Sequence, residues 1–386
     1  MNLSGGRIRW SVLVAAAFTA LSAGVAGAQP VDTGPYPTVP SPPLGAAGSL
    51  QAGARVEGQR MADFVVGPWE VDPTLVGKFD TSAVVIDGPE ALRVELPTEL
   101  ADAAARHNAI DGFGSARWAD DIELQHIVIR FADADTASAA ARDLASALAA
   151  RTVPGGPVVA AIVPGHPDTA AFANPVDEED GRQVTYVRAI TAHGPYVFSQ
   201  RAMAADGVDE AARLIAGMLD RQPARIDRFQ TTPPALLGTL AVDPTGLLAR
   251  TLAPDAADAT AAVPGSYGTH GALHFQDDPV QSGQAFGKYG VGTVAYGQAA
   301  IYQGRDVGAA SLLRDHLFEE YAPFGDEATA VSGVPGSRCA GLTFPTTGNF
   351  RGYCLAATGP YVVEAEGATL IDAQQRLAAQ FLLLTR

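Results

Sequence analysis

The chain has 386 residues, of which 47% are hydrophobic and 7% aromatic, so it can form two folded domains and is not a disordered protein. Its formal net charge is −16 at pH 7. This acidity argues against binding to nucleic acid or to an anionic membrane surface, because both repel a negatively charged protein.

The first 28 residues have the features of a secretory signal. Arg7 and Arg9 form a basic start, residues 10–25 are apolar, and Ala26-Gly27-Ala28 offers a cleavage site before Gln29. We expect cleavage there and no transmembrane span in the rest of the chain; the alternative is an uncleaved anchor. Cleavage removes two arginines and leaves 24 basic against 42 acidic residues, a charge of −18. The sequence thus predicts a secreted or cell-wall-associated protein.

After the signal, six prolines between residues 29 and 49 indicate an extended, mobile linker. A first domain is expected over residues 50–231. Its expected helices are 52–66, 100–106, 133–150 and 208–221, and its expected strands are 83–86, 125–131, 158–163, 183–191 and 196–203. Residues 164–180 are expected to form a loop.

A linker over residues 232–265 is expected to lead into a second domain, 266–386. Its expected strands are 272–275, 294–302, 328–332, 339–344, 350–358 and 361–366, and its expected helices are 280–289, 307–321 and 371–384. No segment after the signal has the length and apolarity of a membrane span.

The two domains look like copies of one unit. Gly194-Pro195-Tyr196-Val197 recurs 165 residues later as Gly359-Pro360-Tyr361-Val362, and 122–130 matches 294–302 at an offset of 172. Each copy runs strand, helix, strand, strand, strand, helix. Because hairpin-linked strands are antiparallel, we predict an α+β fold of two internal repeats, each an antiparallel sheet with two helices on one face, as in a ferredoxin-like layer.

The only two cysteines, Cys339 and Cys354, are predicted to form a disulfide. If Thr346-Thr347 is a two-residue hairpin turn, residues whose numbers add up to 693 face each other across the hairpin. The numbers of Cys339 and Cys354 add up to 693. The cysteines would then lie opposite one another on paired strands. A reactive thiol pair is the alternative, but the chain has no C-x-x-C motif.

Several short motifs occur together: Trp69-Glu70-Val71-Asp72-Pro73, Gly271-Ala272-Leu273-His274-Phe275, and the cysteine hairpin before Gly359-Pro360. As a set they resemble a family of exported actinobacterial proteins, the mycobacterial, nocardial and rhodococcal lipoproteins of unknown function, over about residues 50–386. The resemblance implies export and brings no assigned activity or catalytic residues. A lipoprotein has a Cys at its cleavage site. This chain has Ala28-Gln29 there, which favours free secretion or wall retention.

No catalytic, metal or cofactor motif emerges from the residues. Gly290-Val291-Gly292-Thr293-Val294-Ala295 matches G-x-G-x-x-A but enters a strand instead of opening a helix, so we interpret its glycines as turn residues. His270 and His274 are four residues apart, but the expected strand would separate them by roughly 13 Å, which argues against a shared metal.

Four aromatic residues are the candidate ligand contacts. Tyr196 and Tyr361 occupy matching positions in the two repeats, where they either line a groove or pack in the core. Trp69 and Trp118 lie in irregular stretches, where they either mark a recognition surface or close the open end of a sheet. The leading hypothesis is a non-enzymatic binding or interaction protein whose partner is an envelope lipid, glycan or protein. The alternative is an envelope-directed hydrolase with its site between the repeats.

Overall fold

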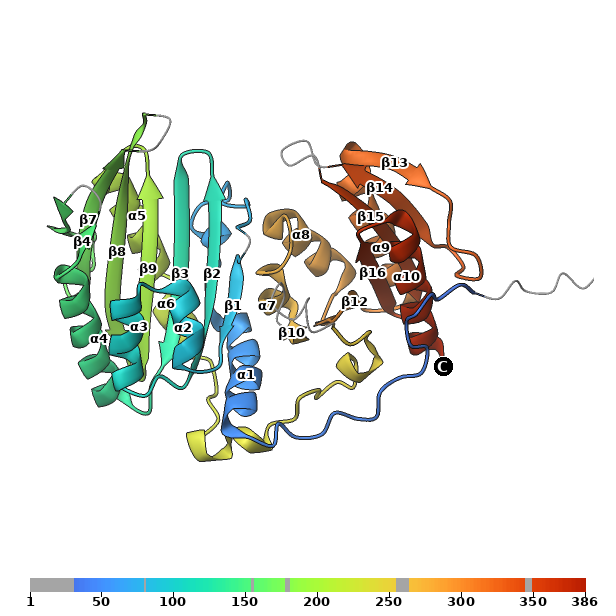
Figure 1. Cartoon of the computed structure of the whole chain (residues 1–386), viewed down its shortest axis with the longest axis horizontal. Coiled ribbons are helices and arrows are strands. Elements are labelled where there is room, and N and C mark those ends of the chain that lie inside the picture. Colours follow the sequence, from blue (N-terminus) through green and yellow to red (C-terminus); the bar gives the residue numbers. More distant parts are fainter. Residues whose placement is uncertain (1–30, 80, 154–155, 178–180, 255–263, 344–348) are drawn as a thin grey trace, which may run out of the picture.

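The computed structural model describes residues 31–79, 81–153, 156–177, 181–254, 264–343 and 349–386 (Figure 1). Two seven-stranded sheets lie side by side, and every pairing within them is antiparallel. The predicted signal peptide and its cleavage site lie outside the described residues. In the described part of the chain, no helix has the length and apolarity that a bilayer crossing requires.

The N-terminal half contains the first sheet, with strand order β1-β2-β3-β9-β8-β7-β6. Its elements are α1 (Leu50–Met61), η1 (Ala62–Phe64), η2 (Pro68–Glu70), β1 (Ala83–Ile86), α2 (Pro89–Glu95), α3 (Thr98–Arg106), β2 (Asp111–Ala119), β3 (Ile122–Arg130), α4 (Ala134–Ala149), β6 (Val159–Ala161), β7 (Ala170–Asp177), β8 (Gln183–His193), β9 (Tyr196–Ala204), α5 (Val208–Leu219) and α6 (Gln222–Ile226). A separate two-stranded ribbon pairs β4 (Thr152–Val153) with β5 (Gly156–Pro157).

The C-terminal half contains the second sheet, with strand order β10-β11-β12-β16-β15-β14-β13. The short helices η3 (Pro234–Thr239) and η4 (Leu248–Arg250) precede it. Its elements are β10 (Gly265–Gly268), α7 (Thr269–Leu273), α8 (Pro279–Tyr289), β11 (Thr293–Tyr296), β12 (Ala299–Gln303), α9 (Val307–Tyr321), η6 (Ala322–Phe324), β13 (Gly325–Ala328), β14 (Arg338–Thr343), β15 (Phe350–Thr358), β16 (Tyr361–Gly367) and α10 (Leu370–Thr385). The predicted α+β class and the two repeat-like halves are therefore confirmed.

The same strand order and register relate the two halves. Tyr196 pairs with Arg130 in the first sheet, and Tyr361 pairs with Gln303 in the second. The helices α4 and α9, which follow β3 and β12, both begin with an aspartate cap. Asp133 accepts a hydrogen bond from the Thr136 amide, and Asp306 accepts one from the Ala309 amide. Corresponding residues of the last hairpin are 165 positions apart in the chain. The two aspartate caps are 173 positions apart, one more than the offset of 172 predicted for the repeat.

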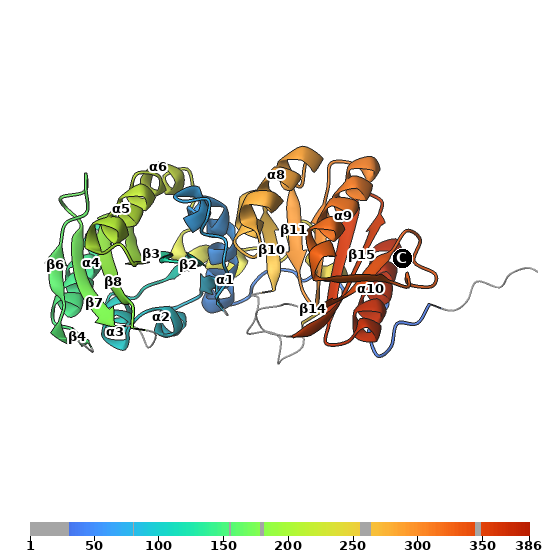
Figure 2. The same cartoon turned by 90° about the horizontal axis from the view of Figure 1, so that it is seen from above.

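The prediction that two helices cover one face of each sheet is wrong. In the first sheet, α4 packs on the face that holds Ile127 and Ile129, whereas α5 packs on the face that holds Val128. The second sheet repeats this arrangement with α9 and α10. Figure 2 shows the helices on both sides of the sheets. The physical reason is that consecutive residues of the central strands are apolar, so both faces of each sheet need a cover.

The two halves share one apolar core. Its largest cluster includes Phe113 and Leu214 from the first half and Phe286 and Leu313 from the second, all fully buried. Separate cores fill the outer faces, one under α2, α3 and α4 and one under α10. Because apolar burial stabilises the folded state in proportion to its area, the halves stabilise each other.

Four elements differ from their prediction. The strand expected at 328–332 lies earlier in the chain as β13, Gly325–Ala328, and overlaps the prediction only at Ala328. The expected loop at 164–180 contains β7, in which Ala171 and Ala173 alternate as buried residues. The single strand expected at 294–302 is a hairpin of β11 and β12, closed by a hydrogen bond from the Gly297 amide to the Ala299 carbonyl at 3.0 Å. The strand expected at 272–275 is replaced by α7, since Asp63 of the other half accepts hydrogen bonds from the Gly268 and Gly271 amides.

The proline-rich segment is extended, as predicted, but its described part is not a free spacer. The Ser41 amide donates to the Ala249 carbonyl at 3.0 Å, and Arg376 of α10 donates to the Tyr36 hydroxyl at 2.9 Å. Ala46 also forms a β-bridge with Ala241. Residues 31–49 therefore pack along the second half and the inter-repeat segment (Figure 1).

Candidate functional site

A cleft of about 710 Å³ lies where the two halves meet. The first half contributes Lys78, Phe79, Ser82 and Ala83 to its lining. The second half contributes the connection between α7 and α8, the β11–β12 hairpin, and parts of β15, β16 and α9. Neither half forms this cleft by itself, so its shape depends on how the halves are held together.

Arg117 of β2 holds the two halves in a fixed position relative to each other. Its fully buried guanidinium donates from Nη2 to the carbonyls of His274 at 2.8 Å and Gln276 at 2.7 Å, and from Nη1 to the Val76 carbonyl at 3.0 Å. The guanidinium also lies 5.7 Å from the centre of the Trp69 ring. Burial lowers the pKa of Arg117 to about 10, so the side chain stays charged at neutral pH. Arg117 therefore binds the α7–α8 connection on the side that faces away from the cleft.

On the cleft side of that connection, Gln276 and Asp277 are held in place. Gln276 Nε2 donates to the Tyr296 hydroxyl at 2.7 Å. Asp277 accepts from Lys78 Nζ at 2.7 Å and from the Tyr321 hydroxyl at 2.8 Å. Although burial opposes the shift, the Lys78 ammonium holds the pKa of Asp277 below its usual value. The carboxylate of Asp277 is thus ionised at the cleft wall.

The opposite wall carries Glu364 of β16. Tyr302 donates a hydrogen bond to its carboxyl group, and Ala300 and Leu355 are its cross-strand neighbours. Burial, together with the negative charge of Glu366, raises the pKa of Glu364 to about 7. The side chain therefore exchanges its proton close to neutral pH.

Aromatic rings and one further ion pair complete the lining. The Tyr321 ring centre lies 4.4 Å from that of the buried Tyr353, and Phe350, at the rim, is 49% exposed. Arg351 pairs with Glu366 at 2.8 Å. Aromatic faces beside hydrogen-bonding and charged groups are the usual composition of a site for a compact polar ligand.

Beside Arg117, a second polar network joins the halves. Glu70 of η2 binds Arg225 of α6 at 2.6 Å and contacts His270 Nε2 at 2.9 Å. Although burial opposes the shift, hydrogen bonds from His270 and Arg225 hold the pKa of Glu70 well below its ordinary value. This network connects three elements from both sides of the junction and is part of the interface.

The expected 13 Å separation of His270 and His274 is wrong, because they lie on α7 and its end with ring centres 5.3 Å apart. His274 is fully buried, with Nδ1 2.8 Å from the Ser115 hydroxyl. Burial holds its pKa well below the ordinary value. Within the described ranges, no group of three or more His, Cys, Asp or Glu side chains is placed to hold a metal ion.

The structure does not bring the two predicted tyrosines together. Tyr196 is buried in the core shared by the halves, whereas Tyr361 is half-buried on the outer face of the second sheet, with the Arg250 guanidinium 5.5 Å from its ring centre. The two tyrosines occupy corresponding register positions. However, the sheet face that carries Tyr196 in the first half packs into the shared core, whereas the same face of the second sheet packs into the outer core. Neither lines the cleft.

The two tryptophans have structural surroundings. Trp69 is buried at the junction, and its ring centre lies 4.9 Å from that of His274. Trp118 is 42% exposed; its indole Nε1 donates to the Lys78 carbonyl at 2.9 Å, and its backbone forms a bridge with Gly77. Trp118 thereby positions the Lys78 segment, which lines the cleft.

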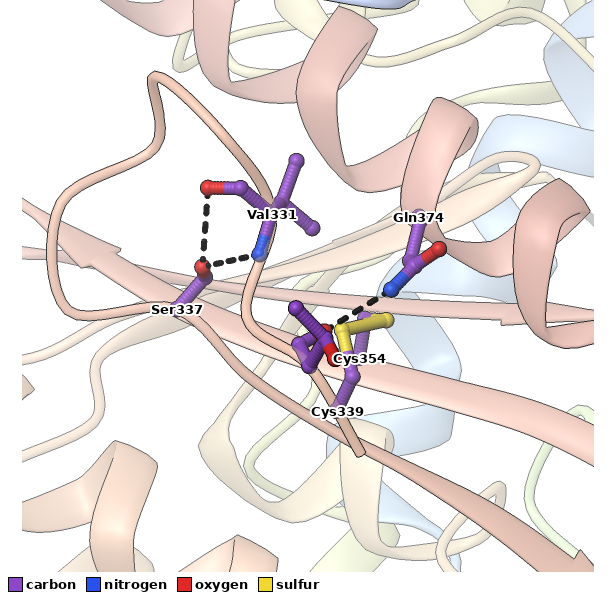
Figure 3. Close-up of a disulfide and its surroundings, with 6 residues drawn as sticks. Val331, Ser337, Cys339, Cys354 and Gln374 are labelled. Carbon is purple, nitrogen blue, oxygen red and sulfur yellow. Dashed lines mark hydrogen bonds between the residues drawn. A yellow bond between two sulfur atoms is a disulfide. The ribbon is translucent and has the colours of Figure 1, made fainter. Parts of the chain in front are cut away.

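The cysteines form the predicted disulfide, and Cys339 and Cys354 are direct partners in the β14–β15 register (Figure 3). The Thr346-Thr347 turn lies outside the described residues. Around the bridge, the Ser337 hydroxyl accepts from the Val331 amide at 2.8 Å, and Gln374 of α10 donates to the Thr329 carbonyl at 2.8 Å. Gly290 caps α8 in the left-handed conformation, which confirms its interpretation as a turn residue.

Sequence reasoning did not find Arg117, Tyr302 or Glu364. Glu364 interrupts the apolar run Val362-Val363 and Ala365 of a central strand, and a carboxylate at such a position is the signal that could have singled it out. Arg117 carries no comparable mark, because its role depends on carbonyls that lie 157 and 159 residues away in the chain.

The N-terminal part of the domain of unknown function DUF7373 matches residues 44–242, and its C-terminal part matches residues 247–386. The chain belongs to the DUF7373 family. No curated protein matches it. Among solved structures, the extracellular domain of PknH from Mycobacterium tuberculosis is similar at 18% identity over 44% of this chain and 96% of that chain, with a TM-score of 0.29. The DUF7373 description assigns no activity.

Proposed function

We propose that this DUF7373 protein is a secreted or cell-envelope binding protein without enzymatic activity, and that its ligand occupies the cleft between the halves. The observation that carries the proposal is the cleft itself, about 710 Å³ and built by residues of both halves. This volume lies in the range of sites for compact ligands, roughly 300–1,000 Å³.

The arrangement of the lining supports binding. Lys78 and Asp277, and likewise Arg351 and Glu366, are paired with each other and hold fixed positions at the walls. Arg117 and the shared core fix the two walls relative to each other. A site whose walls are already positioned loses less conformational entropy when a ligand binds.

An envelope-directed hydrolase is the second candidate. The observation in its favour is that Glu364 lines the cleft with a pKa of about 7, which suits a general acid. In that case Glu364→Gln would abolish turnover of an envelope glycan or ester, while the variant would still bind the substrate. A binding protein instead shows no turnover before or after this substitution.

We also propose that an actinobacterial type of export signal is cleaved near Ala28-Gln29 and that the mature protein is secreted or associated with the cell wall. The disulfide supports an oxidising, extracellular location. The mass of the intact protein recovered from its own secretion medium tests this proposal. A mass that includes residues 1–28 or a lipid would contradict it.

Native mass spectrometry of that mature protein, followed by denaturing extraction, tests the binding function. We expect a co-purifying compound, which Ala300→Phe displaces, because Ala300 lines the cleft beside its cross-strand partner Glu364. Ala368→Trp, at an exposed lining position, serves as a second blocking variant, and Ala330→Phe, exposed and outside the lining, is the matched control. A compound that stays bound in both blocking variants would contradict binding in the cleft.

A further inference from the structure

The repeat register gives counterparts in the first half to the cleft residues Glu364 and Glu366 and to the buried Tyr353 beside them. With the hairpin offset of 165, Glu364 corresponds to Ser199, Glu366 to Arg201 and Tyr353 to Arg188. Likewise, α7 and α8 lie between β10 and β11 as α2 and α3 lie between β1 and β2. The sheet surface under α2 and α3 in the first half can therefore be compared with the sheet surface beside α7 and α8 in the second.

In the first half this position has complementary charges. The sheet presents Arg188 and Arg201, and α2 ends at Glu95, whose carboxylate accepts a hydrogen bond from Gln125 at 2.8 Å. Burial lowers the pKa of Arg188 to about 9, and the negative charges of Glu95 and Glu99 oppose that shift. A basic sheet surface is thus covered by helices that carry acids.

In the second half the charges facing each other have the same sign. The sheet presents Glu364 and Glu366, and the connection after α7 presents Asp277. Lys78 pairs with Asp277 and Arg351 pairs with Glu366, but among the described residues no ion pair joins Glu364 to a cation. A half-buried carboxylate without a cation is unfavourable, so Glu364 favours either a proton or a positively charged partner.

We propose that the cleft binds an organic ammonium compound, whose charged nitrogen lies between Asp277 and Glu364 and whose apolar body packs against Tyr321 and Phe350. The proposal rests on the proposed function of the cleft and specifies its ligand class. An ammonium group supplies the charge that Arg188 and Arg201 supply in the first half. It also gains from aromatic faces nearby, and the exposed ring of Phe350 at the rim offers one.

Three probes of one shape test the charge: phenethylamine, 2-phenylethanol and phenylacetate, titrated into the mature protein at pH 7.5 by ligand-observed NMR and calorimetry. We expect the amine to bind at least tenfold more tightly than the alcohol or the carboxylate. Glu364→Gln should weaken amine binding at least tenfold. Asp326→Asn is the matched control, because it removes one exposed carboxylate from the outer strand β13 of the same sheet.

Proton release gives a readout that a purely structural role of Glu364 would not produce. At pH 7, amine binding should expel part of a proton from Glu364, so the measured enthalpy should depend on the ionisation enthalpy of the buffer. In Glu364→Gln this dependence should disappear. The ionisable groups that face Glu364 from the neighbouring elements are Tyr302, Tyr353, Tyr296, Glu366, Asp277, Tyr321 and Glu320.

The outcomes separate this inference from the proposed function. Equal affinity for the amine and the alcohol, with both displaced by Ala300→Phe, would overturn the cation proposal and leave the cleft as a binding site. Amine affinity that is unchanged in Glu364→Gln would also overturn it. If no probe binds and the native protein carries nothing that Ala300→Phe displaces, the proposed function itself fails.

Discussion

The two halves have the same strand order, but they differ at one corresponding face of their sheets. In the first half, Ile127, Ile129 and Val197 are fully buried on that face under α3 and α4. In the second half, the corresponding face carries Tyr302 and Glu364, and a cleft of about 710 Å³ remains open beside α9 and the α7–α8 connection. A duplicated unit has thus kept its framework in both copies while one copy holds an accessible polar surface.

The difference shows where the framework tolerates polar groups. A carboxyl group in a fully packed layer would be left without a partner, and Ser199, the counterpart of Glu364, is a small residue in such a layer. The junction between the halves leaves space beside Glu364, and Tyr302 of its own half donates the hydrogen bond that its carboxyl group accepts. We infer that contact with the other half allowed this face to acquire a site.

Breaking the junction should have the largest effect. Arg117→Met removes the donors to the carbonyls of His274, Gln276 and Val76, each of which would stay buried without its partner. We expect a loss of about 4 kcal/mol in the free energy of unfolding. Urea denaturation followed by circular dichroism should show the second half unfolding separately.

Arg213→Met is the control for that experiment, because Arg213 is exposed on α5 and pairs only with Glu210 among the described contacts. Its effect should stay within roughly 0.5 kcal/mol. A single transition at unchanged urea concentration in Arg117→Met would show that the shared core alone couples the halves.

The disulfide sharpens the comparison, because the corresponding pair in the first half is Ala171 and Ala189. The double substitution of Cys339 and Cys354 by alanine opens a loop with a separation of 15 residues. The chain-entropy estimate is a loss of about 3 kcal/mol. Hydrogen exchange should show faster opening of β14 and β15 and little change in β7 and β8. Equal loss of protection in both sheets would contradict a local role.

Glu364→Gln should stabilise the protein at alkaline pH but not at acidic pH. The pKa of this carboxyl group is raised from 4.5 to about 7 in the folded protein, so the folded state binds more protons than the unfolded state between these values. Wild-type stability should therefore fall as pH rises from about 4.5 to 7. The glutamine variant should be more stable than wild type at pH 8, by on the order of 2 kcal/mol, and should show no such gain at pH 4.5.

Thermal unfolding across that pH range is the measurement. Glu366→Gln gives the comparison within the same strand: it removes a charge that raises the pKa of Glu364, so the wild-type pH dependence should move to lower pH without disappearing. A pH profile that Glu364→Gln leaves unchanged would assign the titration to another group of the cleft.

The smallest expected effects test the equivalence of the halves. Asp133→Ala and Asp306→Ala each remove a side-chain cap at the same helix position of the two copies. Each should lower the urea midpoint slightly and by a similar amount, and the two effects should add because the sites are independent. Strongly unequal costs, measured by urea denaturation, would show that the copies do not depend equally on this helix.

Local patterns in the sequence were enough for many elements and for the disulfide. The hairpin of Cys339 and Cys354 pairs as the residue numbers predict, and the helix of 307–321 was predicted with its observed bounds. The strands and caps follow from side chains a few residues apart, so one copy could be recognised in the other. The site was less accessible: the four aromatic candidates were chosen by type and position, and none of them lines the cleft.

The sequence by itself determined the α+β class, the repeat and the disulfide register, because these depend on alternation, capping and turns within short segments. Only the tertiary structure decided that both faces of each sheet are covered, that Asp63 of one half starts α7 of the other, and that Arg117 meets the carbonyls beyond it. These features depend on groups far apart in the chain. The charge environment of Glu364 arises in the same way, since Asp277 of the α7–α8 connection approaches β16 only in the folded second half.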